Sequence, residues 1–132
     1  MYQVKLDKEQ METVIRALDL YMRLGIHQID EVKALALEGK LLEKAPLPNN
    51  WHNEVDYLLA ALKSYLWGEA LHAGPGICNP QVPKTFKLAC EICHVLRRFL
   101  AFEREPQGGM GVAFSEVLPI SGHPSLAQVE KI

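Results

Sequence analysis

A long helical series of apolar residues in the first third of the chain most constrains the fold. It runs from Met11 to Leu35 at the three- and four-residue spacing of one helix face. A continuous helix here would be about 45 Å long at about 1.5 Å per residue, whereas a compact monomer of 132 residues is only about 36 Å across. Either the helix breaks near Gly25, which lies on the apolar stripe, or it protrudes and is covered in an oligomer. We expect a homo-oligomer.

Three main helices are predicted along the chain. Asp7 and Gln10 have the spacing of a capping box that opens the first helix, and Gly39 is a candidate for its end. Asn49 or Asn50 caps the second helix, which stops at Gly68. Its expected apolar face is formed by Trp51, Val55, Leu58, Leu59, Leu62, Tyr65 and Leu66. The third helix follows Pro83 and ends at Pro106.

Two short segments are predicted to be strands. Tyr2–Leu6 alternates apolar and polar residues, and Met110–Val117 places Val112, Phe114 and Glu116 on one side. We therefore predict a mostly helical α+β fold, in which a two-stranded β element pairs the N- and C-terminal segments. Residues 1–118 are expected to form one domain, and residues 119–132 an extended or partly disordered arm.

Charge excludes several classes of partner. The chain has 14 Lys and Arg against 16 Asp and Glu, a formal net charge of −2, which is too balanced for a duplex nucleic-acid binder or a polybasic membrane anchor. The segment Met1–Asp7 lacks a basic region followed by an apolar run, and no apolar stretch is long enough to span a membrane. The expected location is the cytoplasm of a host cell.

The motif Cys90-Glu91-Ile92-Cys93-His94 matches the C-x-x-C-H pattern of covalent haem attachment. With Cys78, the residues Cys90, Cys93 and His94 are an alternative zinc site. Both alternatives are disfavoured, because the motif lies inside an amphipathic helix on which Cys93 faces the core, where a free cysteine packs as a small hydrophobic residue. We expect no cofactor, with a small metal- or haem-dependent enzyme as the less favoured alternative.

A binding site for a small anion is the sharper possibility. The irregular stretch 68–83 is long, and it enters the third helix at Asn79 and two prolines. Arg97, Arg98 and Arg104 lie further along that helix, and a guanidinium is well suited to phosphate or carboxylate. Gly108 and Gly109 follow the helix in a turn. These six residues form the candidate ligand site, and we expect parts of it to meet across a subunit boundary.

Several blocks of the sequence resemble a family of short uncharacterised proteins of tailed bacteriophages and prophages. The blocks cover most of the chain, and they comprise residues 4–10, 16–29, 76–83, 95–98 and 106–116. The resemblance implies a phage accessory protein and carries no catalytic residue with it. We therefore expect a non-catalytic binding protein that sequesters a small anionic, nucleotide-like ligand as a counter-defence. The alternative is an interaction module that inhibits a host protein.

Overall fold

A computed structural model describes residues 2–38 and 49–132 of the chain. Its elements are helix α1 (Lys8–Gly25), α2 (Glu31–Leu37), α3 (Trp51–Trp67) and α4 (Lys84–Arg104), followed by the short 3₁₀ helix η1 (Val112–Phe114). The chain divides into two compact units. Unit 1 comprises Met1–Met22 with Ile77–Ile132, and unit 2 comprises Arg23–Gly76. None of the helices in the described part of the chain is long and apolar enough to cross a membrane.

The capping box at the start of α1 is confirmed. The backbone N–H of Gln10 donates to the Asp7 carboxylate at 2.8 Å, and the backbone N–H of Asp7 donates to the Gln10 side chain at 2.9 Å. These two bonds satisfy donors that the first turn of a helix leaves without partners. Helix α1 therefore begins where its local sequence predicts.

The long apolar series breaks where glycine interrupts it. Helix α1 ends at Gly25, and the N–H groups of Ile26 and Gln28 both donate to the Arg23 carbonyl. His27 adopts the left-handed backbone conformation, with φ of 66°. The change of chain direction after α1 therefore lies two residues beyond Gly25. The break removes the length argument for an oligomer, and the homo-oligomer stays a prediction. Gly39, the expected end of the series, lies outside the described residues.

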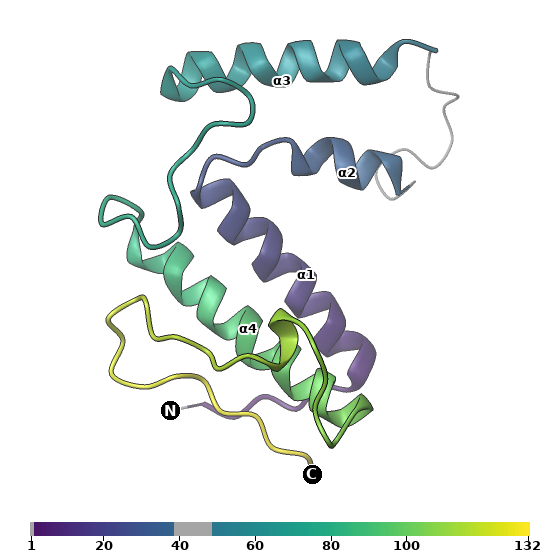
Figure 1. Cartoon of the computed structure of the whole chain (residues 1–132), viewed down its shortest axis with the longest axis vertical. Coiled ribbons are helices and arrows are strands. Elements are labelled where there is room, and N and C mark those ends of the chain that lie inside the picture. The colour runs from purple at the N-terminus through teal and green to yellow at the C-terminus, as the bar shows by residue number, and fades with distance from the viewer. Residues whose placement is uncertain (1, 39–48) are drawn as a thin grey trace. The chain divides into compact units, whose positions relative to one another are not determined.

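The C-terminal end of α3 agrees with the sequence, whereas Asn50 at the N-terminal end makes no side-chain capping hydrogen bond. Asn50 is the residue before the helix, and Gly68 closes it in the left-handed conformation with φ of 67°. The N–H of Gly68 donates to the Ser64 carbonyl, as expected where glycine ends a helix. Within unit 2, α2 and α3 lie side by side and run in opposite directions (Figure 1).

The predicted two-stranded β element is wrong, since residues 2–38 and 49–132 contain no strand. Residues 2–7 have no regular structure, and Tyr2 and Val4 are exposed. In the second segment η1 replaces the strand, and the Phe114 ring meets the Phe102 ring edge-on at 5.2 Å. Alternation alone does not make a strand, because an isolated pair of strands is only marginally stable without a face to bury.

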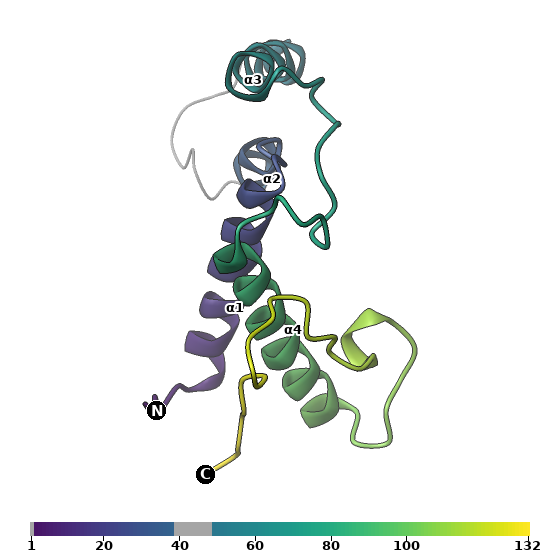
Figure 2. The same cartoon turned by 90° about the vertical axis from the view of Figure 1, so that its left-hand side faces the viewer.

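The core of unit 1 forms between α1 and α4, which lie side by side in Figures 1 and 2. Ile15 of α1 packs with Cys93 and Leu96 of α4, and partly buried apolar residues surround them. One of these is Val129 from the C-terminal segment, which runs along α4 in both views. The segment after residue 118 has no helix or strand, and Val129 packs against the core of unit 1.

Candidate functional site

A cavity of about 630 Å³ lies in unit 1 on one side of α4, a size typical of small-molecule sites. Residues of α4 spaced three or four apart form one wall, and residues after η1 form the other. The lining residues are Val95, Arg98, Phe99, Phe102 and Glu103 from α4, with Glu116, Val117, Leu126, Ala127 and Val129 opposite. The cavity therefore combines an apolar surface with three charged groups.

Arg98 is the cation of this cavity. Its guanidinium carbon lies 4.9 Å from the centre of the Phe102 ring, within the range of a cation–π contact. The Nε atom is buried and has no hydrogen-bond partner within the described residues. A buried donor without a partner costs about 1–3 kcal/mol, and more where the group is charged. An anionic acceptor bound at Arg98 would offset that cost.

Two carboxylates line the same cavity. Glu103 accepts hydrogen bonds from the Lys131 ammonium, at 3.1 and 3.2 Å to its two oxygens. Both side chains of this pair are well exposed, so the pair contributes little to stability. Glu116 has no polar side-chain partner in the part of the chain that the structure describes, and it is exposed. The formal charge of the lining is thus −1, from one arginine and two glutamates.

Glu91 of α4 anchors the C-terminal segment, later residues of which form the second wall. Its carboxylate accepts hydrogen bonds from the backbone N–H groups of Ile120 at 2.5 Å and Ser121 at 2.6 Å, and from the Ser121 hydroxyl at 2.8 Å. Burial opposes ionisation of Glu91, but the bonds from Ser121 and Ile120 outweigh it and lower the pKa of the carboxyl. The wall is therefore tied to α4 through a charged, hydrogen-bonded carboxylate.

The predicted glycine turn lies beside the aromatic end of the cavity. Gly108 has φ of 82°, which favours glycine, and a Cβ there would lie 3.6 Å from the Phe102 ring. A Cβ on Gly109 would come within 2.8 Å of both the Glu105 carboxylate and the Phe114 ring. Small residues at this turn therefore let Phe114 pack against Phe102. Phe102 thus contacts Arg98 and lies near Gly108, but neither Gly108 nor Gly109 lines the cavity.

The other predicted site residues lie elsewhere. The Asn79 side chain accepts a hydrogen bond from the Gln81 N–H at 2.9 Å, and about 20 Å of helix separates Lys84 from Arg98 at about 1.5 Å per residue. Arg97 forms an ion pair with Asp19 at 2.9 Å, which joins α4 to α1. Arg104 is exposed in the last turn of α4 and does not line the cavity. In one chain, therefore, Arg98 alone of the three arginines reaches the cavity.

The cysteines of the C-x-x-C-H motif lie in or near the core. Cys93 is fully buried, and its thiol donates to the Ile15 carbonyl at 3.6 Å. Burial raises the pKa of the Cys90 thiol, and burial also lowers the pKa of His94. Cys78 is exposed. Across residues 2–38 and 49–132, no group of three or more His, Cys, Asp or Glu side chains is arranged to hold a metal ion.

Most of the cavity lining was missed in the sequence prediction. The spacing Val95, Phe99, Phe102 was a usable signal, because it forms a second apolar stripe on α4 beside the core stripe through Cys93 and Leu96. No local pattern marked the opposite wall. Leu126 and Val129 belong to a segment without periodicity, so only the fold places them against α4.

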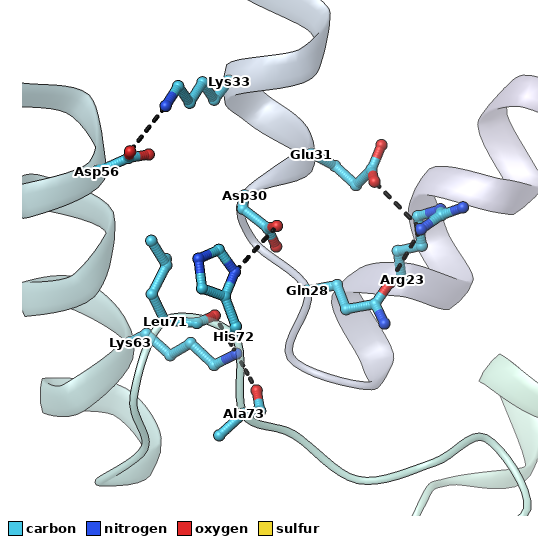
Figure 3. A network of polar contacts seen from close by, with 10 residues as sticks. All are labelled: Arg23, Gln28, Asp30, Glu31, Lys33, Asp56, Lys63, Leu71, His72 and Ala73. Carbon is cyan, nitrogen blue, oxygen red and sulfur yellow. Dashed lines mark hydrogen bonds and ion pairs between the residues drawn. The ribbon is translucent and has the colours of Figure 1, made fainter. Parts of the chain in front are cut away.

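Unit 2 contains a polar network built around a buried lysine (Figure 3). Lys63 of α3 is fully buried, and its ammonium donates to the backbone carbonyls of Leu71, at 2.7 Å, and Ala73. Lys33 of α2 pairs with Asp56 of α3 at 2.7 Å. The Lys63 contacts join α3 to the loop after it, and the Lys33–Asp56 pair joins α2 to α3. We interpret this network as structural.

The face of α3 predicted to be apolar and buried is largely exposed. Trp51 and Leu59 are buried, but Leu58 is 64% exposed and Tyr65 is 90% exposed. The exposed large apolar side chains of this helix are Tyr57, Leu58, Leu62, Tyr65, Leu66 and, at its end, Trp67. Burial of Lys63 explains the shift, because its two carbonyl partners draw the 71–73 loop to that side of α3.

Comparison with known proteins gives one partial likeness. A lysine–tRNA ligase of Wolinella succinogenes is 36% identical over 94 residues, which cover 70% of this chain and 16% of the ligase. The chain thus spans about a sixth of the length of that relative. No family model matches the sequence, and no solved structure matches it either.

Proposed function

We propose that this chain is a non-catalytic binding protein of phage or prophage origin that holds a small anionic ligand in the cavity beside α4. Arg98 carries the proposal, because the residue lines a cavity of ligand size and its buried Nε lacks a hydrogen-bond partner within the described residues. The resemblance of the sequence to phage proteins supports the origin. Sequestration of such a ligand would serve as a counter-defence.

The surroundings of Arg98 favour recognition of an anion. The Phe102 ring packs against the guanidinium and limits its rotamers, so less side-chain entropy is lost on binding. Apolar neighbours such as Val95 and Phe99 line the cavity beside Arg98 and offer no competing polar partner to its guanidinium. A single guanidinium suits one phosphate or carboxylate group.

The test measures ligand binding by calorimetry and by thermal shift. The panel comprises inorganic phosphate, mononucleotides, cyclic dinucleotides and free amino acids, and lysine is included because the partial relative is named as a lysine–tRNA ligase. We expect at least one anion to bind and Arg98→Gln to weaken it about tenfold or more. Arg104→Gln is the matched control, since Arg104 is on the same helix outside the cavity. Equal binding by both variants would refute the site.

The second candidate function is inhibition of a host protein through α3. Its support is the exposed apolar surface formed by Tyr57, Leu58, Leu62, Tyr65 and Leu66, since contiguous apolar surface on a soluble protein often marks an interaction site. The same surface is available for the proposed homo-oligomer.

The double variant Leu58→Asp/Tyr65→Asp separates these uses of α3. Light scattering measures the oligomeric state, and a pull-down from host lysate measures retained partners. Loss of one host protein at unchanged mass favours the host-protein role, whereas a change from oligomer to monomer favours self-association. Retention of both by the variant excludes this face from either role.

A further inference from the structure

The charges around Arg98 restrict the ligand more narrowly than its size does. Glu103 and Glu116 line the same cavity as Arg98. Lys131 compensates Glu103, so a ligand that brings only negative groups still meets the carboxylate of Glu116. Repulsion between like charges disfavours such a ligand, especially one with several phosphates. The ligand should therefore carry a positive group as well.

Lys131 provides an internal example of the positive group. Its ammonium binds both oxygens of Glu103, which demonstrates that this carboxylate accepts a primary ammonium at the edge of the cavity. Lys131 is itself 74% exposed, so its pairing is weak and exchangeable. Glu116, exposed and without a polar side-chain partner in the described parts of the chain, offers a second acceptor.

The spacing of these groups sets the distance between the two charges of the ligand. Arg98 and Glu103 are five residues apart on α4, which places their Cα atoms about 7.5 Å apart along the helix axis. The amine and carboxylate of an ordinary α-amino acid are attached to one carbon, so a ligand with more widely separated charges matches this spacing better. Phe99, Phe102 and Val95 line the same cavity and suit an apolar linker between the charges.

We propose that the cavity binds a small zwitterion whose carboxylate or phosphate pairs with Arg98, and whose ammonium, several carbons away, pairs with Glu103 and Glu116. An ω-amino acid or an amino acid with an ammonium on its side chain belongs to this class. The inference rests on the proposed function of the cavity, and it adds the positive group and the separation of the charges.

Calorimetry with matched probes tests this class. We compare 6-aminohexanoate, which has both charges, with hexanoate, which lacks the ammonium, and with AMP, which lacks an aliphatic ammonium. We expect 6-aminohexanoate to bind about tenfold or more tightly than either of the other two, since one charge-assisted contact corresponds to about a tenfold change in affinity. Norleucine, whose only ammonium is at the α-carbon, should bind no better than hexanoate.

Two variants show which residue binds each charged end of the ligand. Arg98→Gln should weaken both 6-aminohexanoate and hexanoate, whereas Glu116→Gln should weaken 6-aminohexanoate alone. Glu12→Gln, an exposed change on α1 outside the cavity, is the control. Thermal melts of each variant are the check that the fold is retained. Glu116 is exposed, so we expect its substitution to leave the fold intact.

The outcomes separate the two proposals. Binding of hexanoate or AMP as tightly as 6-aminohexanoate, with dependence on Arg98, overturns the zwitterion and leaves the anion site in place. Unchanged affinity of 6-aminohexanoate for Glu116→Gln removes the assignment of that carboxylate and also overturns the proposal. Absence of binding by every probe here and in the anion panel overturns both the inference and the proposed function of the cavity.

Discussion

Two buried charged residues each tie a segment without regular secondary structure to a helix. Glu91 ties residues 120 and 121 to α4, and Lys63 holds the carbonyls of residues 71 and 73. Both side chains are buried, at 3% and 0% exposure, and their charges are compensated by backbone groups. A buried charged group is tolerated only where such hydrogen bonds replace its lost hydration.

The pH dependence of the stability of Glu91→Gln tests whether the ionised Glu91 carboxylate stabilises the fold. The folded pKa of Glu91 lies below its unfolded value of about 4.3, so its stabilisation is fully present above that pH and disappears as the pH falls through the folded pKa. At pH 7 we expect the substitution to lower the free energy of unfolding by about 1–3 kcal/mol. Urea denaturation from pH 7 to pH 3 measures the difference, which should shrink as the pH falls.

Glu12→Gln serves as the control for this titration, because Glu12 is exposed and makes none of these bonds. Its effect should stay within about 0.5 kcal/mol at every pH. A Glu91→Gln deficit that is the same at pH 3 and pH 7 would contradict the role of the ionised carboxylate, and would indicate a packing effect instead.

At the scale of elements, the helices could be predicted from local chemistry and the strands could not. Three helix ends follow from local chemistry: Asp7 caps the start of α1, Gly68 ends α3 in a left-handed conformation, and Pro106, which lacks a backbone N–H, follows the end of α4. Each of these effects acts within a few residues. Strand formation depends instead on a partner distant in the sequence. The alternation in Met110–Val117 reflects Phe114 packing on Phe102 through η1, which the pattern did not distinguish from a strand.

Gly109→Ala tests how the turn after α4 positions η1. A Cβ at Gly109 would lie 2.8 Å from both Glu105 and Phe114, so the Phe114 ring must move. We expect a loss of about 1–3 kcal/mol from this overpacking, measured by urea denaturation. Gly76→Ala is the matched control, because a Cβ there meets no atom within 4 Å. If both variants have the same stability, the close approach at Gly109 has no energetic role.

At the scale of the whole molecule, the division into two compact units bears on cooperativity. Both tryptophans, Trp51 and Trp67, belong to unit 2, whereas Glu91 belongs to unit 1. Each unit has its own internal contacts, and residues in separate contact networks usually act independently on stability.

Tryptophan fluorescence during urea denaturation therefore reports on unit 2. We expect Lys63→Met to lower the midpoint of this transition, because it leaves two loop carbonyls without their donor, at a cost of about 1–3 kcal/mol each where they are buried. Glu91→Gln should leave the tryptophan midpoint unchanged while it lowers hydrogen-exchange protection in α4. An equal shift of the fluorescence midpoint by both variants would support the predicted single domain over residues 1–118.

The candidate site, like the fold, was predictable from the sequence only in part. The arginines and the glycine turn were recognisable as residue types suited to an anion, but helical spacing alone did not tell which of them would share a cavity. Arg97 turns to Asp19 on α1, and Arg98, one residue later, lines the cavity. A rotation of about 100° per residue separates these two environments.

The sequence by itself determined the start of α1, the end of α3 at Gly68 and the core position of Cys93, because capping, glycine and apolar periodicity act locally. It left open whether the first apolar series breaks at Gly25, and the structure resolves that series into α1 and α2. Only the tertiary structure decided that the described residues contain no strand. It also decided that residues 120–131 contact α4 and the core, through Glu91, Val129 and Lys131. The common cavity of Arg98, Glu103 and Glu116 is likewise a tertiary feature. These features join segments far apart in the chain. Their energies depend on which surfaces meet, and a local pattern does not contain that information.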